Sequence, residues 1–414
     1  MTRSSHSTSL PVRVIRFLVM TVNLLACAAL VISAFGGRIN PLTNAWGGIA
    51  VMMFPFCAVA VIVLLLINLC WFRRVALLDF VALAICTGPL LSLCPLNFSR
   101  PSMAAIRSMG DSAIKVMTFN VYNFTDIAPG ASAQGNRTVA YILEQDADVN
   151  LLQEAFTSLH PNGNVSADEI NDLKARYPYI VTDGTGLCLL SKFPIETVHT
   201  EIDPSPSFAA ARYDVEIGGR TVHFFNIHLQ SIGLTDDDKQ LYSRITKGES
   251  KGEVGKIRRD LLGKLKEAMR LRAAQAAQVR AEIEKAGEGP VILGGDFNDI
   301  NGCYALREIM GPNLRDAYRY SGLGPAITYH VNRFYFRIDH FVYGDGVDAL
   351  RTWVGSANSS DHYPLLAYFR LTPPDSITAI NNQSNITKHV KTIINHGRGS
   401  LASAGLNPDR CHGS

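Results

Sequence analysis

Polar side chains stand at the ends of several apolar runs in the middle of the chain. Asn120 ends KVMTFN, Glu154 follows VNLLQ, Asn226 and His228 close HFFNIH, and Asp296 and Asn298 follow VILGG. Buried strands that each end in a carboxylate, an amide or an imidazole can assemble a site at one end of a sheet. The pattern therefore predicts that these side chains meet in one place.

Two Asp-His pairs follow further along the chain. RIDHF contains Asp339 and His340, and SSDHYP contains Asp361 and His362. Oxygen ligands of this kind suit Mg²⁺ or Mn²⁺, which bind few carboxylates and keep waters that can meet a phosphate. A single Asp-His pair can equally be a satisfied surface or capping pair. The prediction of metal-assisted chemistry on a phosphate therefore depends on all the motifs together.

GGDFN is the most specific of these signals. Its two glycines allow a tight backbone turn, which would present Asp296 and Asn298 on the same side, two residues apart. An Asx-rich turn without a function has a similar composition. The occurrence of all the motifs in one order over one stretch favours the functional interpretation.

The elements that must position these residues are short β-rich runs with helices inserted between them. The expected strands cover residues 115–120, 149–153, 187–190, 212–217, 221–228, 291–294, 338–343 and 365–370. Residues 137–145 and 251–285 read as helices, and the mixed charges of the second indicate a solvated face rather than a binding surface. This order predicts a two-sheet α/β sandwich rather than a strictly alternating βαβ fold.

Seven stretches together resemble one known family. They are TFNVYNF, LLQEAF, GLCLLSKFPI, NIHLQS, GGDFNDI, RIDHFVY and SSDHYPLLAYF, and they span about residues 115–370. In this order they resemble the endonuclease/exonuclease/phosphatase superfamily, the metal-dependent phosphodiesterases that include deoxyribonucleases, abasic-site endonucleases, neutral sphingomyelinases and inositol polyphosphate 5-phosphatases. The resemblance implies a deoxyribonuclease-like sandwich with four layers, α/β/β/α.

The resemblance also implies a divalent cation, Mg²⁺ or alternatively Mn²⁺. Glu154 is similar to the main metal ligand of the family, and Asn120 to the residue that helps to hold the metal and the scissile phosphate. Asp361 is similar to a metal ligand or a close neighbour of the site.

Five residues resemble the groups that act on water and phosphate. Asp296 stands where the family orients or deprotonates the attacking water, and Asn298 where it binds a phosphate oxygen. His228 resembles a donor to the phosphate, and His362 the imidazole that contacts the phosphate as negative charge grows. Asp339 resembles the carboxylate that orients this imidazole.

For four other polar residues, the sequence gives weaker support for a role in catalysis or metal binding. His340 stands where the family usually has an aromatic residue, so we expect a structural role. His223 and His330 are not expected to bind a metal. Arg212 would either reach the phosphate or form a cross-strand salt bridge.

The first hundred residues indicate a membrane region. They contain seven arginines, no lysine and a single acidic residue, Asp79, which leaves a net charge of +6 against −3 for the rest. Three apolar runs, at residues 17–37, 39–72 and 75–96, are long enough to cross the hydrocarbon core. The third is the weakest, and a cleaved signal peptide is the alternative for the first. We expect about three transmembrane helices.

The distribution of arginines predicts the topology. Basic residues precede the first run and separate the second from the third, whereas the intervening loop has only one; they are Arg3, Arg13, Arg16, Arg73, Arg74 and, in the loop, Arg38. The positive-inside rule places the N-terminus in the cytoplasm. Three crossings then put the remainder on the opposite face, which in a bacterium is the periplasm or exterior.

The predicted domain organisation has four parts. They are a membrane region at 1–97, a linker at 98–114, a catalytic domain at 115–371 with a helical insert at 232–287, and a flexible polar tail at 372–414. The insert is longer than in compact members of the family and could form a wall over the cleft. The eight cysteines are too scattered for a metal or disulfide framework.

The sequence thus predicts a membrane-anchored, Mg²⁺-dependent phosphodiester hydrolase, with nucleic acid as the favoured substrate. The acidic soluble part lacks a broad basic field for DNA, although a local cluster could contact phosphates: Lys251, Lys256, Arg258 and Arg259. A phospholipid or phosphoinositide is the alternative substrate, because the domain would lie beside a bilayer. A catalytically inactive membrane-tethered binding protein is the alternative of a different class.

Overall fold

Helices make up most of the first hundred residues of the chain. The structure, a computed structural model, describes residues 10–127, 135–156, 164–182, 184–200, 208–233, 254–331 and 335–372. The N-terminal helices are α1 (Leu10–Phe35), α2 (Trp46–Trp71), α3 (Arg73–Ile85) and α4 (Thr87–Leu93), with the 3-10 turn η1 (Gly36–Arg38) after α1. Helices α1 and α2 are each long and apolar enough to cross a membrane. The third expected span corresponds to α3 and α4, which meet at a bend of 65° and form either a broken span or a re-entrant loop.

Polar side chains link these helices inside their apolar surroundings. Asp79 is fully buried, and its Oδ2 accepts a hydrogen bond of 2.7 Å from Asn68 Nδ2. Asn68 Nδ2 also donates to Asn23 Oδ1 at 2.7 Å, and Cys27 Sγ donates to Asp79 Oδ1 at 3.4 Å. The one acidic residue of the apolar front therefore joins α3 to α1 and α2, as intramembrane polar groups commonly do.

Two six-stranded mixed sheets follow. The first has the order β11-β12-β1-β2-β4-β3 and the second β5-β6-β7-β8-β10-β9. The strands of the first are β1 (Ala113–Asn120), β2 (Val149–Gln153), β3 (Tyr179–Thr182), β4 (Cys188–Ser191), β11 (Val347–Val354) and β12 (Leu365–Leu371). Those of the second are β5 (Ile195–His199), β6 (Ala209–Ile217), β7 (Arg220–His228), β8 (Val291–Asp296), β9 (Arg315–Asp316) and β10 (Asp339–Tyr343). Strands β1 and β2 are parallel, as are β7 and β8.

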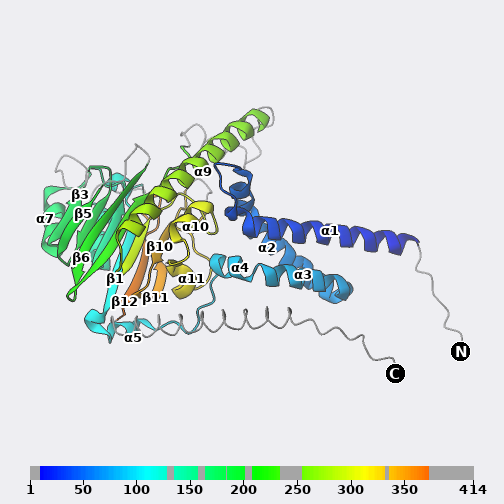
Figure 1. Cartoon of the computed structure of the whole chain (residues 1–414), viewed down its shortest axis with the longest axis horizontal. Helices are drawn as coiled ribbons and strands as arrows, with labels where there is room; N and C mark the ends of the chain where they lie inside the picture. The colour runs from blue at the N-terminus through cyan, green and yellow to red at the C-terminus, as the bar shows by residue number, and fades with distance from the viewer. Residues whose placement is uncertain are drawn as a thin grey trace, which may run out of the picture. The chain divides into compact units, whose positions relative to one another are not determined.

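The sheets face each other and helices cover their outer faces (Figure 1). Helices α6 (Arg137–Gln145) and α7 (Ala167–Arg176) pack on the first sheet, whereas α9 (Val254–Lys285) and α10 (Tyr304–Met310) pack on the second. The shorter helices are α5 (Met103–Arg107), α11 (Ala317–Ser321), η2 (Gly110–Ser112) and η3 (Tyr122–Phe124). This is the expected α/β/β/α sandwich.

Buried amides join the two sheets. Gln153, the last residue of β2, donates from Nε2 to Asn226 Oδ1 of β7 at 2.7 Å. Asn226 Nδ2 in turn donates to the Leu152 carbonyl at 2.9 Å, and both amides are fully buried. Because a buried amide is costly to leave unpaired, this link holds the two sheets in one relative position.

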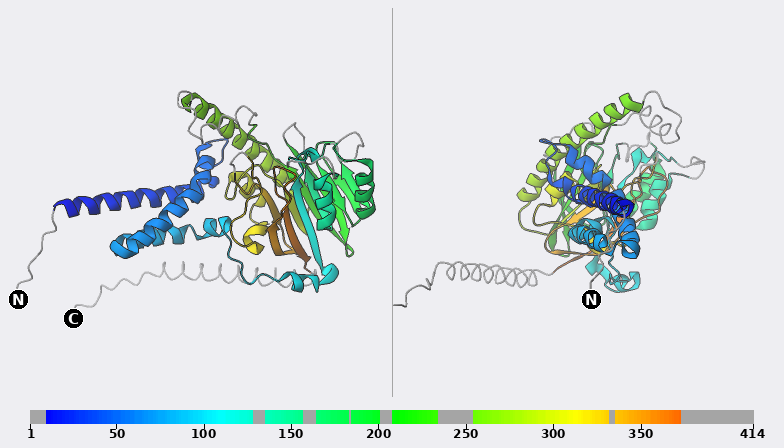
Figure 2. Two further views of the ribbon diagram at one scale, coloured as in Figure 1. Left: turned by 180° about the vertical axis from the view of Figure 1, so that it is seen from behind. Right: turned by 90° about the vertical axis from the view of Figure 1, so that its right-hand side faces the viewer.

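The N-terminal helices dock onto the second-sheet side of the sandwich and extend away from it in the left view of Figure 2. Asn40 Nδ2 donates to Tyr304 Oη at 3.1 Å, and Lys266 Nζ lies 3.6 Å from the centre of the Trp46 ring. A Cβ on Gly37 would lie 1.8 Å from the Gly302 carbonyl oxygen, so only glycine fits there. The N-terminal helices are therefore packed directly against the sandwich.

The structure contains both of the helices that the sequence predicted after residue 115. The helix expected at 137–145 is confirmed as α6, and the one at 251–285 as α9. The latter has more than a solvated face, because Arg272, Ala276 and Val279 are buried against the sandwich. The expected tail after residue 372 lies outside the described residues.

Replacing Asp79 tests the polar link between the helices. In Asp79→Ala, Asn68 loses its buried acceptor, so we expect a cost of about 1 kcal/mol and a lower midpoint of thermal unfolding for the full chain in neutral detergent. Asp79→Asn keeps an acceptor oxygen and should unfold closer to the unaltered protein. Equal midpoints for Asp79→Ala and the unaltered chain would show that the link contributes nothing.

Candidate active site

Strand ends from both sheets meet at one edge of the sandwich. Asn120 ends β1, Glu154 follows β2, His228 ends β7 and Asp296 ends β8. Asn120 Nδ2 donates to Glu154 Oε1 at 3.0 Å and to Asp296 Oδ2 at 3.1 Å, and His228 Nε2 lies 3.7 Å from each of these oxygens. The four residues that the sequence placed at strand ends are thus brought together, two from each sheet.

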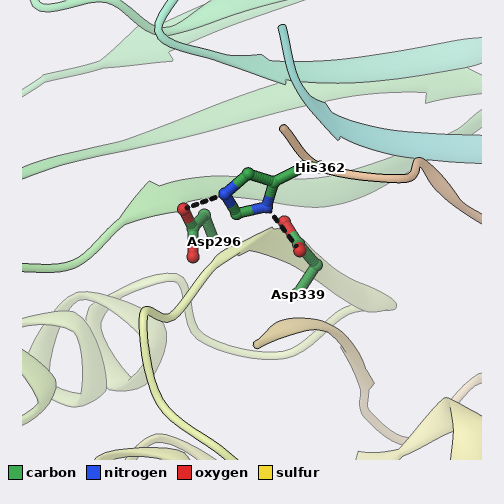
Figure 3. Close-up of side chains that lie close together, drawn as sticks. All are labelled: Asp296, Asp339 and His362. Atoms are coloured by element: carbon green, nitrogen blue, oxygen red, sulfur yellow. Dashed lines mark hydrogen bonds and ion pairs between the residues drawn. The ribbon is translucent and has the colours of Figure 1, made fainter. Parts of the chain in front are cut away.

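His362 lies between two carboxylates (Figure 3). Its Nδ1 bonds to Asp339 Oδ2 at 2.8 Å, and its Nε2 lies 3.6 Å from Asp296 Oδ2. Asp339 begins β10 and is opposite Asp296 in the antiparallel pairing of β10 with β8. The register of these two strands therefore sets the spacing of the carboxylates around the imidazole.

The charges around His362 favour its protonated form. Burial alone would lower the pKa of His362, but the carboxylates of Asp339, Asp296 and Asp361 hold it well above its usual value. For Asp296, burial raises the pKa, the charge of His362 opposes this, and Asp339 raises it further. The site thus pairs an imidazolium with a carboxylate that is more basic than an exposed aspartate.

The turn after β8 presents Asp296 in a fixed orientation. The backbone N–H of Asn298 donates to Asp296 Oδ1 at 2.8 Å, and Asn298 Nδ2 donates to the Leu229 carbonyl at 2.9 Å. A Cβ on Gly295 would lie 2.0 Å from the Ile227 carbonyl oxygen, which explains one glycine of GGDFN.

Two site residues have a left-handed backbone, Asn298 with φ of 51° and Glu154 with φ of 54°. Asparagine adopts this conformation readily, whereas for glutamate it costs about 1–2 kcal/mol. The next residue, Ala155, is held by its N–H bond to the Gly186 carbonyl at 2.7 Å. Such strain at Glu154 is typical of positions selected for function.

Asp361 lies on the same side as Glu154 and Asp296. Burial raises its pKa, the charge of His362 opposes this, and the charges of Glu154 and Asp296 raise it further. The preceding Ser360 donates from Oγ to the Asn120 carbonyl at 2.7 Å and accepts from the His362 N–H at 3.2 Å. Ser360 thus connects the Asp361-His362 segment to the end of β1.

The donor set fits a hard divalent cation. The Glu154, Asp296 and Asp361 side chains all line one pocket, and burial together with the charges of Glu154 and Asp296 raises the pKa of Asp361, which a bound cation would oppose. Ligand atoms of Asp296, Asp339 and His362 also lie within 4.8 Å of one another. Both nitrogens of His362 already face carboxylates, however, so that trio is better described as an ion-paired imidazolium than as a metal site.

The pocket around these residues has a volume of about 250 Å³ and walls from three parts of the chain. Helix α2 contributes Met52, α9 contributes Leu265 and Arg272, and Tyr329 lies beside the His362 ring at 5.1 Å between centroids. The expected wall formed by the insert is therefore present in the described part of α9.

Neither His340 nor His330 lines the pocket that holds the reacting groups. His340 is fully buried, its Nε2 donates to the Asp299 carbonyl at 3.0 Å, and burial lowers its pKa to about 3. It is therefore neutral and structural, as expected. His330 stacks on Tyr363 with ring centroids 3.9 Å apart.

Arg212 and His223 belong to a separate cluster. Arg212 Nε lies 3.2 Å from Asp214 Oδ1 and His223 Nδ1 lies 2.7 Å from the same oxygen. Arg212 therefore does not reach the candidate site, and its salt bridge runs along β6 rather than across to another strand. Of the predicted basic cluster on the insert, only the side chain of Arg259 is among those described, and it is exposed.

No local sequence pattern distinguishes Arg272 from the other cations of its helix. This arginine is 1% exposed, its Nε lies 3.2 Å from Asp299 Oδ2, and its Nη1 donates to the Gln230 carbonyl at 3.0 Å. In the sequence it is one of many cations in a charged helix. The residues after β7 and after β8 are both tied to α9 by this one side chain.

The fold and the paired carboxylate and imidazole groups define a hydrolase that acts on phosphoric esters. A family model described as the endonuclease/exonuclease/phosphatase family matches residues 117–362, and the chain belongs to this family. A model of a domain of unknown function matches residues 16–93. No curated protein matches the chain.

Several solved structures are similar to the chain. An endonuclease/exonuclease/phosphatase family protein from Bacteroides thetaiotaomicron is 17% identical, with a TM-score of 0.43, over 63% of this chain and 98% of that one. A mannosyl-6-phosphatase from the same species is 17% identical, with a TM-score of 0.42, over 62% and 99%. Truncated Caenorhabditis elegans TDP2 is 17% identical, with a TM-score of 0.40, over 62% and 98%.

Asp339→Asn tests the charge on His362. The amide keeps a hydrogen-bond acceptor but removes the charge that raises the pKa of His362, so the imidazolium is lost at a lower pH. We expect the alkaline limb of kcat for bis(p-nitrophenyl) phosphate to shift to lower pH and kcat to fall roughly 100-fold. Asp345→Asn, which changes an exposed carboxylate, should leave both unchanged. An unaltered pH profile in Asp339→Asn would contradict this role of the carboxylate.

Proposed function

We propose that the chain is a membrane-anchored, Mg²⁺-dependent phosphodiester hydrolase. The observation that carries the proposal is the convergence of Glu154, Asp296, Asp361 and His362 in one pocket, with His228 Nε2 3.7 Å from Glu154 and from Asp296. Such a set combines oxygen ligands for a hard cation with imidazole donors for a phosphate.

Glu154, Asn120 and Asp361 would hold the cation. When bound, it would polarise the phosphorus–oxygen bonds and stabilise the negative charge that develops during attack. Mg²⁺ is favoured over Mn²⁺ because no imidazole belongs to this ligand set.

The remaining residues act on water and phosphate. Asp296 takes a proton from the attacking water, and its raised pKa suits it to this role. His362 donates from Nε2 to a phosphate oxygen while Asp339 holds Nδ1, and His228, whose Nε2 lies 3.7 Å from Asp296 Oδ2, is a second donor to the phosphate. Asn298 fixes Asp296 through its backbone N–H and binds a phosphate oxygen through its amide.

The surroundings of the pocket favour a phospholipid phosphodiester as the substrate. Met52 of α2, a candidate membrane span, lines the same pocket as Asp296 and His362, together with the apolar Leu265 and Ile338. A substrate that lies in a bilayer could therefore reach the site. Nucleic acid is the second candidate, supported by the exposed Arg259 on α9, the helix that supplies Leu265.

The helices also support the proposed topology. Arg13 lies near the start of α1, and Arg73 and Arg74 are the first residues of α3, whereas the loop between α1 and α2 contacts the sandwich. The positive-inside rule then places the N-terminus in the cytoplasm and the catalytic domain outside it. A reporter fused after residue 370 that gives a cytoplasmic signal would contradict this orientation.

Hydrolysis by the full chain in neutral-detergent micelles tests the reaction. We expect turnover of phospholipid phosphodiesters that requires Mg²⁺, stops with EDTA and falls at least about 1000-fold in Asp296→Ala, because general base and charge contributions are lost together. Double-stranded and single-stranded DNA, RNA, sphingomyelin and phosphoinositides are assayed in parallel.

The matched control is Asp345→Asn, which should keep full activity. DNA cleavage without lipid cleavage would identify nucleic acid, the second candidate, as the substrate. Metal-independent turnover, or activity retained in Asp296→Ala, would refute the mechanism. Absence of turnover on every substrate in a folded chain would favour the tethered binding protein.

Leu265→Trp tests the wall formed by α9. The larger side chain narrows the pocket, so we expect kcat/KM for a bulky substrate to fall by roughly tenfold more than kcat/KM for bis(p-nitrophenyl) phosphate. Leu271→Trp, at an exposed position of the same helix, is the matched control. An equal effect on small and bulky substrates would show that Leu265 does not restrict substrate size.

A further inference from the structure

A second, larger cavity lies where the N-terminal helices meet the sandwich. Its volume is about 730 Å³, and its walls come from the ends of α1, α2, α3 and α4 on one side and from residues 300–337 on the other. Ile300 and Phe336 line both this cavity and the active-site pocket, so the two are neighbours. The proposed catalytic groups Asp296 and His362 line only the smaller pocket.

The lining of this cavity is strongly cationic. It contains five arginines and one carboxylate, Asp316. Arg337 is paired with Asp316 at 2.7 Å, and Arg315 lies 3.7 Å from the exposed Asp345. The other three are Arg38, Arg307 and Arg319, and none of them forms an ion pair with a carboxylate of the described residues.

The three unpaired arginines come from different elements. Arg38 ends η1, Arg307 belongs to α10, and Arg319 belongs to α11. Burial lowers the pKa of Arg307, and the charge of Arg38 lowers it further, which shows that these two cations lie near each other. Arg319 reaches towards α4, with Nη2 3.7 Å from the position that a Cβ on Gly88 would take. Like charges that face one cavity repel each other unless an anion lies between them.

Apolar side chains from both sides also line the cavity. Val51, Phe54 and Ile85 belong to the N-terminal helices, and Phe56 beside them is 63% exposed. On the sandwich side, the lining residue Tyr335 is 57% exposed. A ligand that fills this cavity must therefore combine a negative group with hydrocarbon.

The position of the cavity agrees with this chemistry. It lies at the C-terminal end of the first candidate span and along the N-terminal part of the second, the side on which lipid headgroups would lie nearest if these helices cross a bilayer. Arginines near a membrane surface attract anionic lipids. A soluble phosphate would satisfy the arginines, but it would leave the apolar side chains without a partner.

We propose that this cavity binds the phosphate headgroup of an anionic phospholipid through Arg38, Arg307 and Arg319, with the acyl chains against α2 and α3. The site is distinct from the proposed catalytic pocket and borders it through Ile300 and Phe336. The inference depends on the membrane anchoring proposed above, but not on the proposed reaction.

Binding of a fluorescent phosphatidylglycerol to the full chain tests the site. The titration uses neutral-detergent micelles and EDTA, so that no metal-dependent hydrolysis consumes the probe. We expect tighter binding than for phosphatidylcholine with the same label. In the double variant Arg307→Gln/Arg319→Gln, affinity for phosphatidylglycerol should fall about fivefold for each arginine removed. Arg307→Lys/Arg319→Lys keeps the charges and should retain most of the affinity.

The matched control is Arg370→Gln, which removes an exposed arginine of β12 that lies outside the cavity. Equal affinity in the glutamine double variant and the unaltered chain would overturn the proposal, as would equal binding of the two lipids. Displacement of the lipid by inorganic phosphate or glycerol 3-phosphate at similar concentrations would assign the site to a soluble phosphate and refute the lipid.

Hydrolysis measured on the same preparations separates this proposal from the catalytic one. Asp296→Ala should lose hydrolysis and keep phosphatidylglycerol binding. Binding of phosphatidylglycerol without hydrolysis of any substrate in the unaltered chain would support the lipid site and refute only the proposed hydrolase reaction.

Discussion

The hydrogen bond between Gln153 and Asn226 is the contact on which the arrangement of the site depends. It joins the end of β2 in one sheet to β7 in the other, in an interface that is otherwise largely apolar. Apolar packing alone tolerates small shifts of one sheet over the other, but a buried amide pair does not, because each lost bond leaves a desolvated polar group. The 3.1 Å contact between Asn120 and Asp296, which also crosses between the sheets, requires this fixed position.

The site is organised by an excess of buried negative charge. Asp296, Asp339 and Asp361 lie near a single imidazole whose protonated form they stabilise. A buried charged side chain needs a partner of opposite charge. This is also true of the charged side chains in the loops that carry the site. Arg272 pairs with Asp299 after β8, and Arg337 pairs with Asp316 before β10. These two pairs restrain the segments that follow and precede the catalytic strands.

The sequence predicted the interior strands of each sheet but not the strands at its two edges. All eight expected strands are interior ones, and the four that were not expected, β3, β5, β9 and β11, are the edge strands of the two sheets. Interior strands are covered on both faces and therefore read as continuous apolar runs. Edge strands such as β3 are partly exposed, so their side chains carry little hydrophobic signal.

The same distinction applies to the site. Three site residues end or directly follow interior strands, and the local sequence pattern was enough to select them: Glu154, His228 and Asp296. The same pattern also predicted that they meet at one edge of the sandwich. Arg272 and Ser360 could not, because their importance arises from contacts with residues distant in the chain. The bend between α3 and α4 was likewise signalled only by Gly88 and Pro89 in the weakest of the three apolar runs.

The close approach of Gly37 to the Gly302 carbonyl limits the substitutions that the chain can accept at this contact. Backbone meets backbone there, with no side chain in between that could be exchanged for a smaller or larger one. Gly302 also has a positive φ of 80°, which disfavours most other residues. The N-terminal helices and the sandwich therefore share one contact whose shape cannot be adjusted by a substitution on either side alone. Joining this catalytic domain to different N-terminal helices would require a replacement for that contact as well as for the helices.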